Sequence, residues 1–63
     1  MSKFIISTDG IVTDDDGKIV FQSSVSSQAH AREIVHETIA DKGYTIDEEW
    51  EMDDDTIELT FNN

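Results

Sequence analysis

The 63-residue sequence contains no cysteine. This absence excludes disulfide bonds, a thiolate metal site and a cysteine nucleophile, and it favours a reducing compartment over a secreted scaffold. The sequence also lacks an apolar run of the roughly 18 residues that a membrane span needs, and polar residues follow residues 4–6 where a signal peptide would continue. We therefore expect a soluble, cytoplasmic protein with one small domain over residues 1–63.

Basic residues are scarce, because four Lys and Arg stand against fifteen Asp and Glu and give a net charge of −11. Affinity for a phosphate backbone comes from neutralising it with basic side chains, so direct binding to nucleic acid is disfavoured, and so is an anionic membrane. A basic protein surface is the natural complement, since opposite potentials speed encounter and select against wrong partners. The charge could instead act only as a solvent shield, and the sequence leaves both alternatives open.

The first third of the chain predicts a β-hairpin around the turn signal of residues 14–17, Asp-Asp-Asp-Gly. A four-residue loop there pairs Val12 with Ile19. One face then gathers the bulky residues Phe4, Ile6, Val12, Ile19, Phe21 and Val25. The Asp9-Gly10 dipeptide is itself a hairpin signal that could split the first strand, but we expect a single bent or bulged strand.

The middle of the chain predicts an amphipathic helix. Its inward positions follow the spacing i, i+3, i+4, i+7 and i+8 and are Ala31, Ile34, Val35, Thr38 and Ile39. Ser26 or Ser27 can cap the start, and Gly43 can adopt the left-handed conformation just past the end, with Tyr44 touching the last turn. We expect the helix to run from about Ser27 to Lys42.

Residues 47–61 predict a second hairpin, with eight carboxylates and no basic residue. A loop through Asp53 and Asp54 pairs Trp50 with Ile57 and places Glu49 opposite Glu58. The residues facing the core are then Ile46, Trp50, Ile57, Leu59 and Phe61. A slip of one residue would set these side chains against carboxylates, so we discount it.

Two hairpins on either side of one helix predict an α+β fold, a two-layer ββαββ sandwich. Its four-stranded antiparallel sheet carries the helix packed on one face, and the other face stays open. The simplest strand order places the first strand beside the strand that follows the helix.

The predicted register lines up carboxylates on the open face. Alternate residues of a strand lie about 6.7 Å apart on one face, so Asp47, Glu49 and Glu51 would form a row of charge. We predict a partner-binding surface made of Asp47, Glu49, Glu51 and Glu58, of the turn residues Asp53, Asp54 and Asp55, and of Asp14, Asp15 and Asp16. Such a row can imitate the regularly spaced charge of DNA or RNA.

These features predict a non-enzymatic, acidic protein-binding module that inhibits a nucleic-acid-handling protein by docking into its basic site. Small acidic proteins of this general kind occur among phage-encoded inhibitors of host defence and host polymerases. Two alternatives remain open. One is a structural or assembly subunit that self-associates, as a homodimer for example, through an edge strand or through the neutral patch of Ile5, Ile11 and Val20. The other is an immunity or antitoxin partner of a basic toxin.

Catalytic and metal-binding motifs are missing from the sequence. His30 and His36 are six residues apart, which excludes the i, i+4 pair of a helical zinc site. Residues 14–18 resemble part of a calcium loop, but Val12 and Ser23 stand where the first and last ligands are needed. No Ser has an evident His and acid around it, and there is no Gly-rich phosphate loop. We expect no enzyme activity, no cofactor and no metal.

Overall fold

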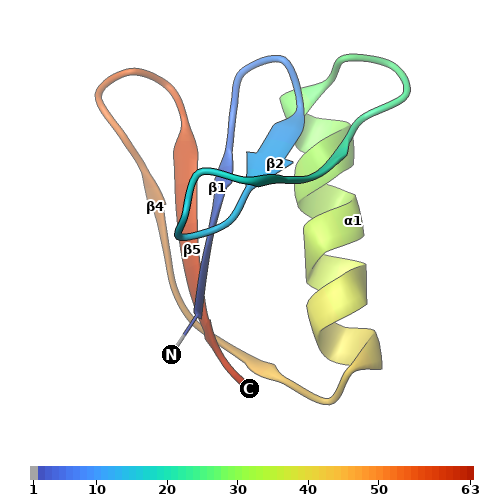
Figure 1. Cartoon of the computed structure of the whole chain (residues 1–63), viewed down its shortest axis with the longest axis vertical. Helices are drawn as coiled ribbons and strands as arrows, with labels where there is room; N and C mark the ends of the chain where they lie inside the picture. The colour runs from blue at the N-terminus through green and yellow to red at the C-terminus, as the bar shows by residue number, and fades with distance from the viewer. Residues whose placement is uncertain (1) are drawn as a thin grey trace.

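A computed structural model of the chain describes residues 2–63. The elements, in chain order, are β1 (Ser2–Ile6), β2 (Ile11–Thr13), β3 (Ile19–Gln22), α1 (Gln28–Asp41), β4 (Thr45–Glu51) and β5 (Ile57–Asn62). The strands form one antiparallel sheet in the order β3-β2-β1-β5-β4, and α1 packs against one face (Figure 1). The predicted α+β class is confirmed, whereas the predicted number of four strands is wrong. Within residues 2–63, no helix is long and apolar enough to cross a membrane.

The additional strand arises because the chain reverses at Gly10. Ser7 N–H donates to the carbonyl of Ile11 over 2.9 Å, Gly10 N–H donates to Ser7 O over 3.0 Å, and Gly10 has a φ of +79°. The single bent strand expected here is therefore wrong, and the Asp-Gly dipeptide forms a turn instead. The reversal places Ile6 directly opposite Val12, so that both side chains enter the core.

The C-terminal strand β5 lies in the middle of the sheet, between β1 and β4. This order differs from the predicted one, in which the strand after the helix would adjoin the first strand. The reason is the chemistry of the two strands. β5 carries the buried residues Leu59 and Phe61, which need neighbours on both sides, whereas three of the four carboxylates of β4 are exposed and stay hydrated at an edge.

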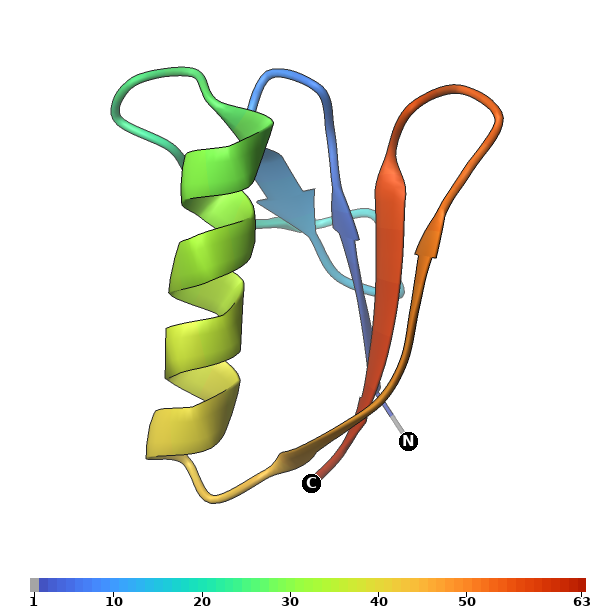
Figure 2. The ribbon, with the colours of Figure 1, turned by 180° about the vertical axis from the view of Figure 1, so that it is seen from behind.

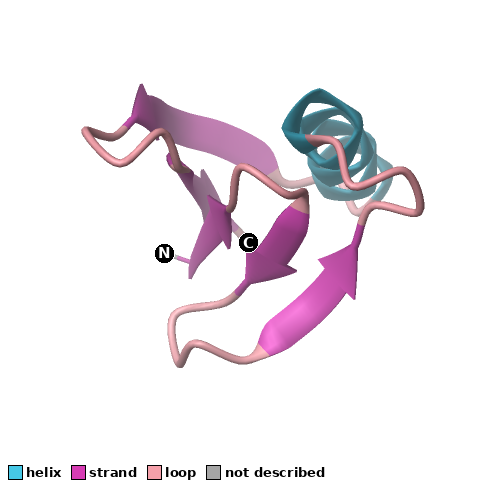
Figure 3. Cartoon of the chain, turned by 90° about the horizontal axis from the view of Figure 1, so that it is seen from above, coloured by secondary structure: helices cyan, strands magenta, loops and turns pink. Residues whose placement is uncertain are grey.

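The sheet follows an arc, and α1 lies on its inner side (Figures 2 and 3). The buried hydrophobic residues between them are Ile6, Val12, Ala31, Val35, Ile39, Leu59 and Phe61. We call the other side the outer face. A row of directly opposed residues crosses it through all five strands: Ile19, Thr13, Ile5, Glu58 and Trp50.

Four residues predicted for the core lie at the surface instead. The exposed fractions are 59% for Ile19, 65% for Val25, 59% for Trp50 and 37% for Ile46. In β3 the cause is a bulge opposite Val12 and Thr13, which sets Val12 against Phe21 rather than Ile19. Phe21 then packs on the core and Ile19 turns outward.

The helix prediction is confirmed at both ends. Ser27 caps the start of α1, because its Oγ accepts from His30 N–H over 3.2 Å. At the other end Gly43 has a φ of +76°, and Tyr44 N–H donates to Ile39 O over 3.1 Å, which forms a Schellman motif. These caps fix where α1 begins and ends relative to the sheet.

Candidate protein-binding face

A bulge at Asp47 sets the geometry of the acidic hairpin β4–β5. Ile46 lies opposite Phe61 as predicted, but the register then shifts, and Glu49 lies opposite Leu59 while Trp50 lies opposite Glu58. The one-residue slip that we discounted from the sequence therefore exists beyond the bulge. It exchanges the faces of the strand, so that Glu49 points towards α1 and Trp50 points away from it.

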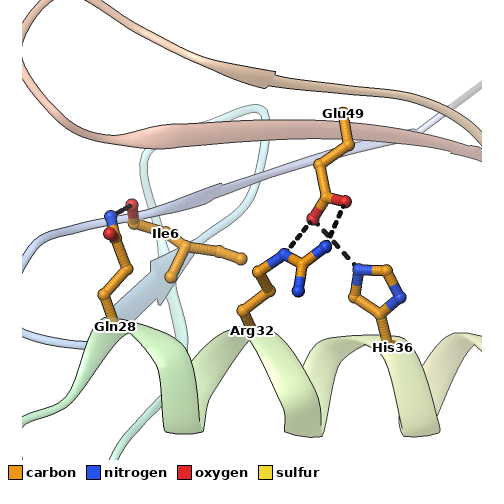
Figure 4. A network of polar contacts seen from close by, with 5 residues as sticks. All are labelled: Ile6, Gln28, Arg32, His36 and Glu49. Atoms are coloured by element: carbon orange, nitrogen blue, oxygen red, sulfur yellow. Dashed lines mark hydrogen bonds and ion pairs between the residues drawn. The ribbon is translucent and has the colours of Figure 1, made fainter.

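Glu49 is tolerated beside the core because α1 presents two basic side chains to it (Figure 4). Arg32 Nε donates to Glu49 Oε2 over 2.8 Å, and Arg32 Nη2 donates to Oε1 over 2.9 Å. His36 Nε2 lies 3.0 Å from Oε2 and must carry the proton, since a carboxylate only accepts. The two-point contact with Arg32 has the geometry of a strong, oriented ion pair. It joins the edge strand β4 to the helix.

The pKa of Glu49 lies below its ordinary value of 4.5. Partial burial opposes ionisation, but hydrogen bonds from Arg32 and His36, together with their charge, outweigh it. The same contact raises the pKa of Arg32, through the hydrogen bond to Glu49 and then through its charge. Glu49 is thus ionised and engaged within the fold.

Trp50 is the largest side chain on the outer face. Its indole Nε1 donates to Glu48 Oε2 over 2.8 Å, which fixes the ring along the edge strand. With more than half of its surface exposed, the ring leaves a large aromatic area in contact with water. Exposed tryptophans of this kind are over-represented among the residues that dominate binding energy at protein interfaces.

An open depression lies beside Trp50, between β1 and the hairpin β4–β5. The residues that line it are Ile5, Trp50, Glu51, Met52, Asp53, Asp54, Thr56 and Glu58. Ile5, Trp50 and Met52 provide an apolar surface, and the carboxylates form its rim. Only one cation pairs with this rim in the described part of the chain, since Lys3 Nζ lies 3.7 Å from Glu58 Oε1. The depression thus combines exposed apolar area with an excess of negative charge.

The acidic turn of residues 53–55 belongs to this same end of the sheet. Asp54 Oδ1 accepts from the Thr56 hydroxyl over 2.7 Å and from Thr56 N–H over 3.1 Å. These bonds hold the pKa of Asp54 below its ordinary value. Asp53 and Asp55 are exposed to solvent. Asp54 therefore shapes the tip of the hairpin, while Asp53 and Asp55 are exposed beside it.

The other acidic turn, residues 14–16, lies at the opposite end of the strands. Asp14 Oδ1 accepts from the N–H groups of Asp16 and Lys18 over 2.9 and 3.0 Å, so Asp14 shapes its own turn. The turn approaches Ser2 and Phe61, near the start of β1 and the end of β5. This turn and the Trp50 depression share no lining residue.

The ten predicted partner-binding residues thus fall into separate groups. Glu51, Asp53, Asp54 and Glu58 line the depression, and Asp55 lies at its tip, whereas Glu49 contacts α1 and Asp47 lies in the bulge. The straight row of Asp47, Glu49 and Glu51 facing Glu58 is wrong, because Glu58 shares its face with Trp50 instead.

Sequence reasoning missed the roles of Arg32, His36 and Trp50. The spacing of the helix contained one indication of the roles of Arg32 and His36. Together with Gln28 they recur every four residues and so form a polar stripe along the helix. Gln28 also reaches the sheet, and its Nε2 donates to Ile6 O over 3.2 Å (Figure 4). Nothing in the sequence shows that this stripe would face β4.

The two histidines make separate contacts. His30 Nδ1 lies 2.9 Å from Ser23 Oγ, near the start of α1, and His36 contacts Glu49. Across residues 2–63, no group of three or more His, Asp or Glu side chains is arranged to hold a metal ion.

Comparisons with known proteins identify no relative of this chain. The chain matches no protein-family model, no curated protein and no solved structure.

Proposed function

We propose that the protein is a non-enzymatic acidic module that binds a basic surface of a partner protein through the Trp50 depression. The observation that carries this proposal is the position of Trp50, more than half exposed on the sheet face that no helix covers and bordered by carboxylates. An aromatic ring excludes water from the centre of an interface, and the surrounding charge selects and orients the partner.

Arginine and lysine side chains fit both parts of this surface. Their methylene stems can pack on Ile5 and Met52, and a cationic head can stack on the Trp50 ring while it meets a carboxylate of the rim. Arginine suits the site better, because its planar group stacks on aromatic rings and pairs with carboxylates at the same time.

A nucleic-acid-binding protein is the partner class that this chemistry favours. Its own binding site displays arginine and lysine at close spacing, and occupation of that site would exclude the nucleic acid. In this proposal the protein acts as a competitive inhibitor. The basis is local charge around an aromatic anchor, rather than a straight row of carboxylates along β4.

Affinity capture tests the proposal. The immobilised protein is incubated with lysate at low salt, bound proteins are eluted by a salt step, and each purified candidate is titrated against the wild type and Trp50→Ala. We expect Trp50→Ala to weaken binding by about 10- to 100-fold, as loss of an interface anchor does. Its stability should change little, because the ring is largely exposed.

A matched pair of double variants separates local charge from net charge. Glu51→Gln with Asp53→Asn removes two carboxylates at the depression, and Glu33→Gln with Glu37→Gln removes two exposed ones from α1. The first pair should weaken binding and lower its dependence on salt, and the second should leave affinity almost unchanged. Equal effects of the two pairs, or unchanged affinity in Trp50→Ala, would contradict the proposed site.

A further inference from the structure

The outer strand at the other end of the sheet, β3, is apolar and exposed. Ile19 is 59% exposed and Val20 is 46% exposed, and Val25, just after the strand, is 65% exposed. Three of the six exposed large hydrophobic residues in the described part of the chain therefore lie along this one edge. Clusters of this kind mark interaction surfaces more often than single exposed apolar residues do.

The two outer strands differ in how they are protected from pairing with another chain. Both contain a bulge, but only β4 also carries charged residues, Asp47, Glu48, Glu49 and Glu51, which keep edge strands apart. β3 carries no charged residue, and no Asp or Glu occurs between Gly17 and Arg32. On a chain with a net charge of −11, this edge is where two copies can approach with the least repulsion.

The backbone of β3 is available for pairing. Within residues 2–63, β2 is the only strand hydrogen-bonded to it, and α1 packs on β1, β2 and β4 instead. Alternate N–H and C=O groups of an outer strand point away from the sheet and need partners or water. An identical strand running antiparallel satisfies them on both sides at once, because a two-fold axis makes the contact self-complementary.

We propose that β3 is a dimerisation edge, at which two copies of the chain pair their β3 strands antiparallel and join their sheets. The contact would cover part of the exposed apolar surface of Ile19 and Val20 in both copies. It places the two acidic hairpins β4–β5 at the far ends of the joined sheet, since β4 is the strand most distant from β3 in the sheet order. Both Trp50 depressions then remain open, so the dimer does not depend on the proposed function.

Sedimentation equilibrium of the full chain over a range of protein concentrations, at low and at high salt, tests this assignment. We expect a monomer–dimer equilibrium that salt strengthens, because salt screens the repulsion between two acidic copies. This dependence has the opposite sign to that of a complex with a basic partner, which salt weakens. A chain that stays monomeric at every concentration and salt level would overturn the proposal.

Two variants with the same charge change localise the contact. Val20→Lys should weaken the dimer by about tenfold or more, since it places a desolvated charge in the new sheet. Met52→Lys adds the same charge at an exposed position of the other hairpin and should leave the dimer unchanged or slightly tighter. Equal weakening by both variants would place the contact elsewhere.

A third variant and a spectroscopic map guard against misfolding of Val20→Lys. Ile19→Thr removes apolar area and keeps both the β-branch and the charge, so it should weaken the dimer with the fold intact. In wild-type protein, amide chemical shifts should change with concentration at Ile19–Gln22 and stay constant at Thr45–Glu51. Concentration-dependent shifts at Thr45–Glu51 instead would assign the interface to β4 and refute the proposal.

Discussion

The turns at residues 7–11 and 52–56 share one backbone geometry and differ in what surrounds them. In both, the first N–H donates to the last carbonyl, over 2.9 and 2.8 Å, and the fourth N–H donates to the first carbonyl over 3.0 Å. The fourth residue has positive φ in each, +79° at Gly10 and +68° at Asp55. This is a type I turn followed by a left-handed residue, for which glycine is preferred. The comparison separates what the fold requires from what it merely tolerates.

Gly10 is required by packing as well as by φ. A Cβ added there would lie 2.6 Å from Ser27 O and 2.7 Å from Ser23 Cβ, which is too close for any real contact. The turn is therefore pressed against the segment that starts α1. Asp55 lies at an exposed tip, and its carbonyl accepts from Gln28 Nε2 of the helix over 2.8 Å. Packing therefore requires glycine in the turn at residues 7–11, whereas the exposed turn at residues 52–56 can carry a charged residue.

The largest effect should come from Gly10→Ala. The added methyl group must displace the backbone at Ser27, and we expect a loss of about 3 kcal/mol or more in the free energy of unfolding, measured by urea denaturation. Gly17→Ala is the matched control, because Gly17 has a φ of +80° but no atom within 4 Å of the added Cβ. It should cost only about 1 kcal/mol, from backbone strain alone. Equal losses would show that the Ser27 contact contributes nothing.

A second contrast lies within β4, between the carboxylates of Glu49 and Glu51. They lie two residues apart in the same strand, but in the described part of the chain only Glu49 has basic partners. Glu49→Gln should lower the free energy of unfolding by about 1 kcal/mol, a value reduced for the partial exposure of Arg32. Glu51→Gln should change it by less than about 0.5 kcal/mol. Chemical denaturation at neutral pH measures both, and the reverse order would contradict the assigned ion pair.

The same pair predicts how stability depends on pH. Glu49 has a lower pKa in the folded chain than its ordinary value of 4.5, so its contribution is complete above pH 4.5 and is lost as the pH falls through the folded-state pKa. The stability difference between wild type and Glu49→Gln should therefore shrink to zero in acid. A difference that stays constant down to low pH would mean that the carboxylate is not ionised against Arg32.

Local signals were sufficient to predict the helix and its limits. Ser27 and Gly43 act on their own neighbours, and the inward spacing of α1 depends on adjacent turns only. The acidic turn after β2 could also be predicted, because turn residues act on their own neighbours. Ile46 lies opposite Phe61 as predicted because the bulge at Asp47 compensates for the shifted pairing nearer the turn. The helix on one face of an antiparallel sheet followed from these elements.

The strand register and the candidate site depend on contacts between distant residues. The bulge at Asp47 is favourable because Arg32 and His36 satisfy Glu49, and no pattern within β4 contains that information. The alternating hydrophobic pattern of β4 predicts Trp50 in the core, because this pattern contains no information about the contact of Glu49 with α1. Where an alternating pattern can be satisfied in two registers, tertiary ion pairs can decide between them.

The smallest predicted effect returns to Asp55. Asp55→Gly should stabilise the protein by about 0.5 kcal/mol, because it relieves positive φ and removes one charge from an acidic tip, although glycine also loosens the unfolded chain. Asp55→Asn separates the two causes, since asparagine tolerates the left-handed conformation and lacks the charge. Urea denaturation of the three proteins measures the gains, and a less stable Asp55→Gly would show that the tip is not strained.

Binding measurements on the same two variants address why an aspartate occupies that position. If the carboxylate serves only as a solvent shield, Asp55→Gly and Asp55→Asn should bind a captured basic partner as tightly as wild type. If the tip belongs to the recognition surface, both should bind more weakly while at least one is more stable. Glycine occupies the left-handed position of the other two turns, at Gly10 and Gly17. In the second case, the aspartate at position 55 would be explained by partner recognition rather than by folding.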